Sequence, residues 1–179
     1  NKDIDIIIYG ATGFTGQLCV KYFQSLETTV KWAIAGRNIE KLSKVAADNH
    51  TTVEILAADA DDEIALDKLT SRAKVILSTA GPFHRYGSKL VASCIKNNSH
   101  YVDITGENFW VKGLIEKHHE EASSKGIRII PSCGFDSIPS DLGSYFAAKS
   151  IGKPIKRIES FHSFEAVSYT HLRAHETLL

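Results

Sequence analysis

The sequence has no excess of charge of either sign and no long apolar run. Its 179 residues carry 21 Lys and Arg against 21 Asp and Glu, so they do not predict the basic surface that nucleic-acid binding requires. No stretch approaches the roughly 18 apolar residues of a membrane-spanning helix, and no charged segment followed by an apolar leader opens the chain. We therefore expect neither a nucleic-acid partner nor a membrane span, and a location in the cytoplasm or at an intracellular membrane.

Cysteine is scarce, and histidine shows no metal-binding motif. Cys19, Cys94 and Cys133 are odd in number and far apart, which indicates neither a disulfide framework nor a zinc site and favours a reducing compartment. His171 and His175 have the spacing of one helix face, but they lack the glutamate of H-E-x-x-H and a third ligand. We expect no metal.

What the sequence does contain is an alternation of strand-like and helix-like segments. Ile6, Ile7 and Ile8 form a β-branched run that suits a strand buried on both faces of a parallel sheet. The further strands expected are Val30–Ala35, Val53–Ala58, Val75–Thr79, Tyr101–Ile104 and Ile127–Ile130, separated by apolar residues at helical spacing such as Leu42, Val45 and Ala46, or Leu90, Val91, Cys94 and Ile95. Six such units predict an α/β fold with a doubly wound parallel sheet of the Rossmann type.

Three glycines follow the first strand, in the motif G-x-x-G-x-x-G. Apolar residues at helical spacing come after them, so the glycines occupy a strand-to-helix turn. Backbone N–H groups and the positive end of a helix dipole at such a turn stabilise a phosphate. A turn that uses glycine only for tightness is the alternative, because Thr12 replaces the middle glycine of the commoner fingerprint. The candidate cofactor residues here are Gly10, Thr12, Gly13, Phe14, Thr15 and Gly16.

The ends of the second and third strands bear on the choice of cofactor. Arg37 and Asn38 stand where an acid would bind a ribose hydroxyl, and an arginine there pairs with the 2′-phosphate of NADP. We therefore expect NADP(H), against the alternative of a solvated surface arginine. Asp59 can accept a hydrogen bond from the adenine amine, or it can cap the next helix together with Asp61 and Asp62.

The fourth strand ends in "STAGPFHRYG" at the carboxyl edge of the sheet, where open α/β sheets bind ligands. Ala80 and Gly81 are small enough for the nicotinamide ribose to pass close, and Pro82 follows them; a plain Gly-Pro turn is the alternative. His84 and Tyr86 come next, near the expected hydride. Asp103 and Glu107 follow the fifth strand in the same way.

Five motifs together resemble one family. "YGATGFTG", "AGRN", "AGPFHRYG", "YVDITGE" and "CGFDSIPSDLG", in this order, are similar to the saccharopine dehydrogenase-like oxidoreductases, which include the trans-acting enoyl reductases of lipid biosynthesis. The similarity runs from about Asp5 to about Phe164. It implies a Rossmann NADP-binding domain, a following α/β substrate domain and, in the enoyl reductase branch, hydride transfer to a lipid-linked unsaturated acyl group.

The resemblance also assigns residues. It implies that Gly10–Gly16 form the turn that binds the phosphate and that Arg37 binds the 2′-phosphate. It also implies that Gly81 and Pro82 form the turn beside the nicotinamide. It supplies no catalytic acid, for which the candidates are Tyr86 and Asp136. Saccharopine reductases themselves have another segment in place of "GFDSIPSD", so the lysine-pathway reaction is not implied.

The expected domains are 1–131 for NADP binding, 132–166 for the truncated start of a substrate domain, and 167–179 for a non-native tail, since "VSYTHLRAHETLL" has no place in the family pattern. Residues 153–164 are expected to form the first strand of the substrate domain. We expect the chain as given to bind NADPH but to turn over almost no substrate, because it has only the cofactor-binding side of a reductase. The expected partners are a small-molecule or lipid-linked acyl substrate and other copies of the chain in a homo-oligomer.

Two other functions are compatible with parts of the sequence. Ser132, Tyr145 and Lys149 have the Ser, Tyr-x-x-x-Lys spacing with which short-chain dehydrogenases protonate a carbonyl. In that fold the serine ends the fifth strand, whereas Ser132 follows the sixth. An NADP-holding domain can also serve as a redox sensor without catalysis, with Cys133 either a reactive thiol or a small buried side chain.

Overall fold

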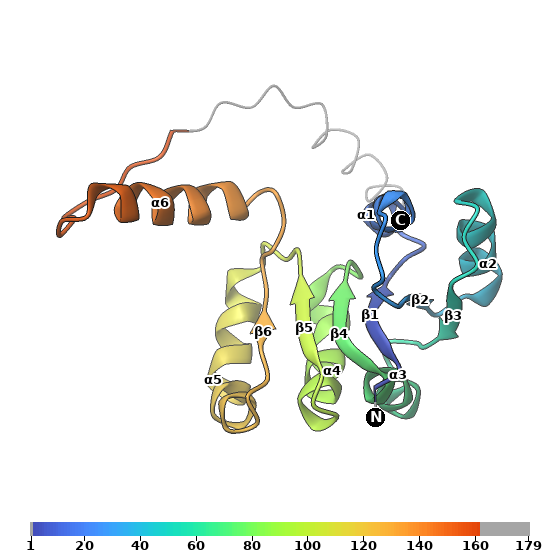
Figure 1. The fold of residues 1–179 in the computed structure, drawn as a ribbon. Coiled ribbons are helices and arrows are strands. Elements are labelled where there is room, and N and C mark those ends of the chain that lie inside the picture. Colours follow the sequence, from blue (N-terminus) through green and yellow to red (C-terminus); the bar gives the residue numbers. More distant parts are fainter. Residues whose placement is uncertain (1, 162–179) are drawn as a thin grey trace, which may run out of the picture. The chain divides into compact units, whose positions relative to one another are not determined.

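The computed structural model describes residues 2–161. Strands and helices alternate along them (Figure 1), and the chain divides into two compact units, Asn1–Ile138 and Pro139–Leu179. The elements are β1 (Ile4–Tyr9), α1 (Phe14–Ser25), β2 (Trp32–Gly36), α2 (Ile39–Asp48), β3 (Glu54–Ala57), α3 (Glu63–Arg72), β4 (Ala73–Ser78), α4 (Phe83–Lys96), β5 (His100–Asp103), α5 (Asn108–Ser124), β6 (Ile129–Ile130) and α6 (Ile138–Ile151).

The six strands form one sheet in the order β3-β2-β1-β4-β5-β6. Every neighbouring pair is parallel, and Ile8 of β1 is in register with Ile34 of β2 on one side and with Leu77 of β4 on the other. This is the expected doubly wound Rossmann sheet. The strand order reverses between β1 and β4, and the crevice outside the carboxyl ends of the strands at such a point is where these sheets bind ligands.

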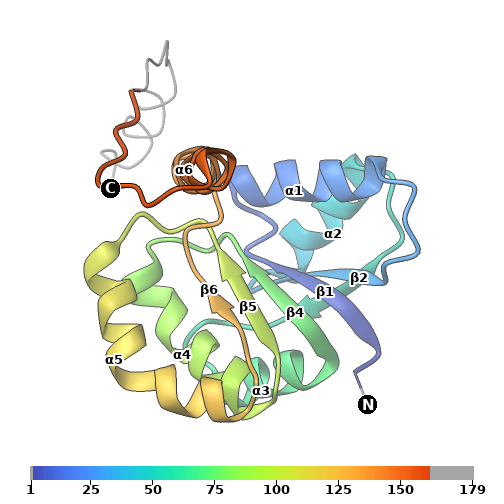
Figure 2. The same cartoon turned by 60° about the vertical axis from the view of Figure 1, so that its left-hand side comes forward.

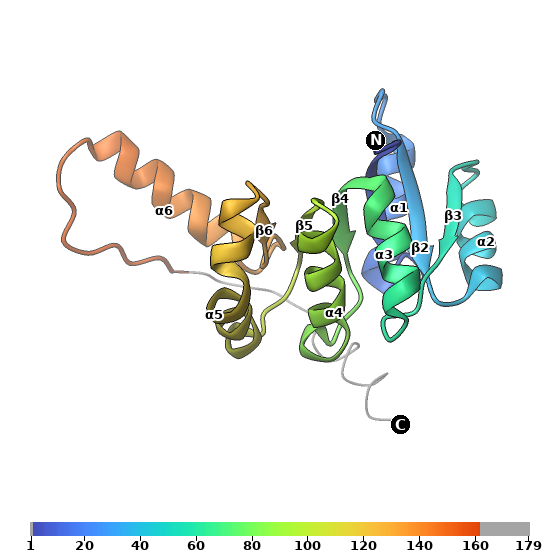
Figure 3. The same cartoon turned by 90° about the horizontal axis from the view of Figure 1, so that it is seen from below.

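Helices cover both faces of this sheet. Figure 2 shows α1 and α2 on one face, and Figure 3 shows α3, α4 and α5 following one another along the other. Because side chains alternate along a strand, Ile7 packs in the cluster with Leu66 and Leu90, and Ile8 packs with Val20 and Leu42. Both isoleucines are fully buried, so the expectation that β1 is covered on both faces is confirmed.

Helix α1 forms where its apolar spacing predicts it, yet its apolar stripe faces outward. The helix instead buries Gly16 and Val20. A Cβ added to Gly16 would lie only 2.2 Å from the carbonyl oxygen of Gly10, so the helix packs close to the preceding turn through its smallest residue. The stripe residues are exposed by 71%, 52%, 62% and 39%, for Phe14, Leu18, Tyr22 and Leu26 respectively.

In the second unit, residues 153–161 form neither helix nor strand. The expectation that residues 153–164 begin a strand is therefore wrong for the part that is described; residues 162–164 lie outside it. The apolar residues Ile155, Ile158 and Phe161 are three apart, and a strand brings residues to one face only at intervals of two. Within residues 2–161 no helix combines the length and the apolar character needed to cross a membrane.

Candidate functional site

A cavity of about 370 Å³ opens at the carboxyl ends of β1 and β4, the point where the strand order reverses. The expected cofactor residues Phe14, Thr15, Gly16 and Asn38 do not line it, nor does the catalytic candidate Asp136, which is exposed in the turn before α6. The lining consists of Tyr9, Gly10, Thr12, Gly13, Gly36, Arg37, Asp59, Ala60, Thr79, Ala80, Gly81, Pro82 and Tyr86.

The three glycines after β1 differ in what the fold requires of them. Gly10 has a φ of +85°, and a Cβ there would lie 2.8 Å from the backbone nitrogen of Ala80. Gly16 has no room for a Cβ either, as described above. A Cβ on Gly13 would meet only the Gly10 carbonyl oxygen, at an ordinary 3.4 Å. Close packing therefore requires glycine at positions 10 and 16 but not at position 13. Gly13 lines the cavity, where a side chain would take up space.

Helix α1 begins at the wall of this cavity, at its N-cap residue, and has no side-chain cap. Gly13 is the N-cap residue, and no side chain accepts a hydrogen bond there. No acidic residue occupies the first turn, so the N–H groups at this end of the helix and the positive end of its dipole are not neutralised by the helix's own residues. This is the arrangement in which a helix N-terminus binds a phosphate.

Thr79 ties the turns after β1 and β4 together. Its backbone N–H donates to the carbonyl of Tyr9 (2.9 Å) and its hydroxyl donates to that of Gly10 (3.1 Å). Tyr9 in turn donates its hydroxyl to the carbonyl of Ala58, at the end of β3 (3.3 Å), and burial raises the pKa of this phenol so that it stays neutral. Sequence reasoning missed both residues, although each lies at the end of a strand already expected at this edge.

Arg37 lies exposed directly after β2 and lines the cavity. The residue that follows it at the end of the strand is Asn38 and not an acid. Asn38 is the N-cap of α2, and its side-chain oxygen accepts a hydrogen bond from the N–H of Lys41 (2.8 Å). Arg37 therefore contributes a cationic side chain to the cavity wall that also carries Asp59, and Asn38 supports the helix that follows.

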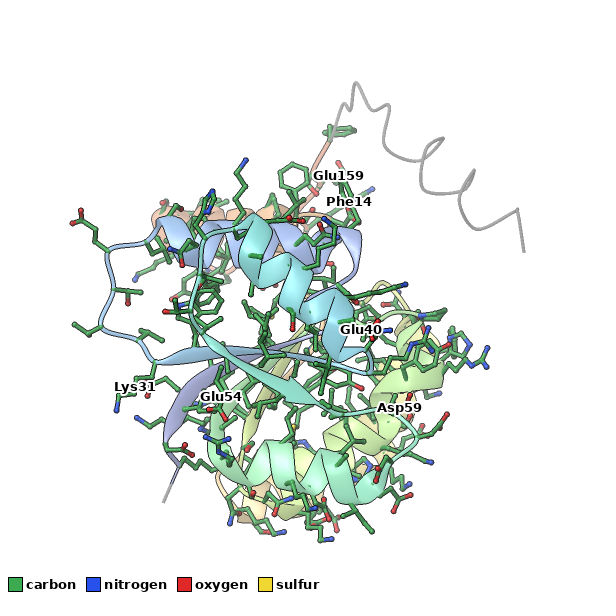
Figure 4. The ribbon with its side chains drawn as sticks, turned by 90° about the vertical axis from the view of Figure 1, so that its right-hand side faces the viewer. Phe14, Lys31, Glu40, Glu54, Asp59 and Glu159 are labelled. Carbon is green, nitrogen blue, oxygen red and sulfur yellow. The ribbon has the colours of Figure 1, made fainter. Side chains whose placement is uncertain are left out.

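Asp59 lies just past the end of β3, at the same end of the sheet as the start of α2 (Figure 4). Its carboxylate accepts a hydrogen bond from the N–H of Asp61 (2.9 Å). The cap of α3 is Asp62, which accepts from the N–H of Ala65 (3.0 Å). Of the two roles considered for Asp59, the helix cap is therefore wrong, and its place on the cavity wall leaves the adenine contact as a prediction.

The turn after β4 forms the opposite end of the cavity. A Cβ on Gly81 would meet only the ring of Phe83, at 3.5 Å, so this glycine, like Gly13, is not demanded by packing. Tyr86 is half-buried on the wall, and the guanidinium of Arg85 lies 5.3 Å from the centre of its ring. At this end the cavity is lined by the small residue Gly81 at the turn and by the aromatic ring of Tyr86 beyond it.

Glu107, in the loop between β5 and α5, reaches the first turn of α4. Its carboxylate accepts hydrogen bonds from the backbone N–H groups of Phe83 and His84 (2.8 Å each) and lies 2.7 Å from Nδ1 of His84. Burial raises the pKa of Glu107, but these hydrogen bonds and the nearby imidazole outweigh it, and the net pKa is lowered. Glu107 is therefore ionised and serves as a cap supplied to α4 from another element.

Asp103, at the end of β5, is buried and holds the segment after β6. It accepts hydrogen bonds from the Tyr101 hydroxyl (2.9 Å) and from the N–H groups of Thr105 (2.9 Å) and Ser132 (3.0 Å). Burial raises its pKa despite these bonds. The Ser132 hydroxyl donates to the carbonyl of Thr105 (2.8 Å). Both side chains thus act as supports for the loops at this edge of the sheet.

Cys133 shows no activation as a thiol. It is half-buried, its sulfur contacts the carbonyl oxygen of Ile130 at 3.3 Å, and burial followed by the charge of Asp103 raises its pKa. A raised pKa keeps the thiol protonated and unreactive. Over residues 2–161, no three His, Cys, Asp or Glu side chains come together as a metal site would require.

Comparison with known proteins places this geometry in a family. The family model of the saccharopine dehydrogenase NADP binding domain matches residues 6–130. Over 147 residues the chain is 42% identical to trans-acting enoyl reductases of Mycobacterium leprae and of Mycobacterium tuberculosis (strain ATCC 25618 / H37Rv), a match that covers 80% of this chain and 35% of each relative. The chain thus spans about a third of the length of these relatives.

A solved structure agrees on the fold. Apo saccharopine dehydrogenase (L-Glu forming) from Saccharomyces cerevisiae is similar with a TM-score of 0.68 at 17% identity, over 83% of this chain and 31% of that one. The family model matches residues 6–130, and the cavity lies where the strand order of the sheet reverses. The chain therefore belongs to the saccharopine dehydrogenase NADP binding domain family of oxidoreductases, and its cofactor is NADP(H).

Proposed function

We propose that the chain is the cofactor-binding part of a reductase that transfers hydride from NADPH to an unsaturated acyl group linked to a lipid. The observation that carries the proposal is the cavity itself, which has a helix N-terminus without a side-chain cap at Gly13 and the cationic side chain of Arg37 on its wall. The relatives at 42% identity are named trans-acting enoyl reductases, which favours a carbon–carbon double bond as the group reduced.

The residues of the cavity fit the parts of NADPH in order. The turn from Gly10 to Gly13 and the start of α1 would hold the pyrophosphate, because they offer backbone N–H groups and close approach. Arg37 would pair with the 2′-phosphate, and Asp59 would accept from the adenine amine. Gly81 would allow the nicotinamide ribose past the end of β4. When bound, the nicotinamide supplies the hydride, and the protein supplies position and exclusion of water.

The short-chain dehydrogenase alternative has less support. Ser132 follows β6 rather than β5, and its hydroxyl is engaged with the Thr105 carbonyl. Tyr145 and Lys149 lie on α6 in the second unit, where the Lys149 ammonium is 5.9 Å from the tyrosine ring centre. The redox-sensor alternative is weakened by the raised pKa of Cys133.

The domain boundaries accompany this proposal. We propose that residues 1–131 bind the cofactor and that residues 132–166 begin the substrate-binding part. The tail from Val167, which we propose to be non-native, lies outside the described residues. Tyr86 stays a candidate for the catalytic acid because it lines the cavity, whereas Asp136 does not line it.

The test is NADPH oxidation by the complete product of the gene, followed at 340 nm with a 2-enoyl thioester as acceptor. Oxidation that requires the thioester, and that is lost in Gly13→Val, is the result expected. Gly113→Val is the matched control, since Gly113 lies in α5 with open space where a Cβ would be. Oxidation with a ketone but not with the thioester would favour the short-chain dehydrogenase alternative, and tight NADPH binding with no acceptor would favour the sensor.

A further inference from the structure

Tyr9 joins separate parts of the cofactor cavity to one another. It is the last residue of β1, it is only 3% exposed, and it lines the cavity. Its carbonyl oxygen accepts a hydrogen bond from the N–H of Thr79 after β4 (2.9 Å), and its hydroxyl donates to the carbonyl of Ala58 after β3 (3.3 Å). Because β2 lies between β1 and β3, the side chain crosses a whole strand to make this second bond.

Strand β2 leaves room for the tyrosine ring. Ala35 is in register with Tyr9, and Ala33, Ala35 and Ala58 belong to the same buried cluster as the ring. The small side chains on this face of β2 let a tyrosine on β1 reach the end of β3. There the N–H of Ala58 donates to the carbonyl of Gly36 (3.0 Å). Ala58 is therefore held by β2 through its N–H and by Tyr9 through its carbonyl.

Ala58 is the buried start of the loop that carries Asp59. Ala58 is 2% exposed, whereas Asp59 is exposed and lines the cavity. The carboxylate of Asp59 accepts a hydrogen bond from the N–H of Asp61 (2.9 Å), a bond that lies within the loop itself. The Tyr9 hydroxyl instead ties the loop to the strand that leads into the glycine turn. Tyr9 thus fixes the position of Asp59 relative to Gly10 across the cavity.

Charges at the proposed adenosine end act on the Tyr9 hydroxyl. Burial raises the pKa of Tyr9, the charges of Asp59 and Asp61 raise it further, and the charge of Arg37 lowers it. The hydroxyl is therefore close to the residues that are proposed to bind adenine and the 2′-phosphate. Because it stays neutral, it donates its one proton to the Ala58 carbonyl and adds no negative charge beside a 2′-phosphate.

We propose that Tyr9 determines the preference of the site for adenine by positioning Asp59; this rests on the proposed function, in which Asp59 accepts from the adenine amine. Adenine carries an amino group that donates to a carboxylate, whereas hypoxanthine has at that position an oxygen that only accepts. A carboxylate held in place favours the first base and disfavours the second. Without the tie to β1, the carboxylate can withdraw from the base, and the preference falls.

The first test is calorimetric titration of the 179-residue chain with NADPH and with its deaminated analogue, in which hypoxanthine replaces adenine. The wild-type chain should bind NADPH about tenfold more tightly than the analogue. Tyr9→Phe removes only the hydroxyl, and it should bring the two affinities within threefold of each other, chiefly by weakening NADPH.

Tyr101→Phe is the matched control. Tyr101 is also fully buried and its hydroxyl donates to Asp103 (2.9 Å), but it does not line the cavity. Both variants should lower the melting temperature by a similar amount, roughly 2–4 °C. Tyr101→Phe should keep the wild-type preference for adenine, so a loss confined to Tyr9→Phe is not a consequence of general loosening.

The second test asks whether Tyr9 acts through Asp59. Asp59→Ala, at an exposed position, should by itself remove the preference for adenine. Adding Tyr9→Phe to Asp59→Ala should then change the affinity for either cofactor by less than twofold. Losses that add up in the double variant would show that Tyr9 acts independently of Asp59, which would overturn its positioning role.

The outcomes separate this proposal from the proposed function. If the wild-type chain binds NADPH and its analogue equally, if Tyr9→Phe keeps the preference, or if Tyr101→Phe loses it as well, the role of Tyr9 is overturned while the cofactor function stands. If a chain that circular dichroism shows to be folded binds neither ligand, the proposed function itself is wrong.

Discussion

Replacement of Gly13 by valine separates binding from folding more cleanly than any other change at this site. Gly13 has φ −74° and ψ 166°, an extended conformation that valine adopts readily, and its added Cβ would make only ordinary contact with the Gly10 carbonyl oxygen. The remaining cost is that of a poorer N-cap, about 1 kcal/mol at most. For a chain of this size that lowers the melting temperature by roughly 2–4 °C.

The effect on the cofactor should be much larger. A branched side chain at Gly13 would occupy the space in which we propose that backbone N–H groups approach the pyrophosphate. Loss of one or two hydrogen bonds to a charged group, at roughly 1.5–3 kcal/mol each, weakens NADPH binding by about 100-fold. Gly16→Ala is the contrasting variant, because its Cβ would lie 2.2 Å from the Gly10 carbonyl and 2.7 Å from Cα of Ala11, both backbone atoms. It should lose about 3 kcal/mol of stability or more.

The assay combines thermal unfolding by circular dichroism with NADPH titration by calorimetry for wild type, Gly13→Val, Gly16→Ala and the control Gly113→Val. Gly13→Val should lose affinity while its melting temperature falls by no more than roughly 2–4 °C, and Gly16→Ala should lose stability. NADPH binding by Gly13→Val at the wild-type affinity would refute the reasoning and return the turn to a purely structural role. A collapse of its melting temperature would refute the packing argument.

Three further outcomes are expected. Arg37→Glu should weaken NADPH binding by about 30-fold or more and leave NADH within threefold; unchanged NADPH affinity in calorimetry would show that Arg37 does not read the 2′-phosphate. The pKa of Glu107 is lowered in the folded state, so its stabilisation is present above the unfolded pKa and is lost as pH falls through the folded one; Glu107→Gln should cost about 1–2 kcal/mol at pH 7, a difference that shrinks in denaturant titrations toward pH 3. Deletion of residues 167–179 should leave NADPH affinity unchanged, and loss of binding in that variant would mean that the tail is part of the site.

The strands and the fold class could be predicted because a strand that is buried on both faces is a short run of apolar residues in the sequence. Ile6–Ile8 form an unbroken β-branched run, and each later strand is a similar short apolar segment between helical patterns. The phosphate turn was also predictable, since glycine spacing between a strand and a helix is a local signal. Residues 153–161 show the limit of this reading, because apolar content alone indicated a strand where the spacing of three could not form one face.

The contacts that organise the site were beyond prediction because they join residues distant in sequence. Glu107 reaches His84 across 23 positions, and Thr79 bonds to Gly10 across 69; neither distance follows from local pattern. The different roles of Gly10, Gly13 and Gly16 depend on which atoms lie where a Cβ would be. The outward stripe of α1 was equally hidden, since the close approach through Gly16 decides which face is buried.

The most direct test of the central claim is calorimetric titration of the 179-residue chain with NADPH and with NADH under the same conditions. The start of α1 without a side-chain cap, the open position at Gly13 and the exposed Arg37 on the cavity wall predict saturable binding of NADPH at one site per chain, at least tenfold tighter than NADH. Equal affinity for the two cofactors, or no binding of NADPH by a chain whose circular dichroism shows it folded, would contradict the account.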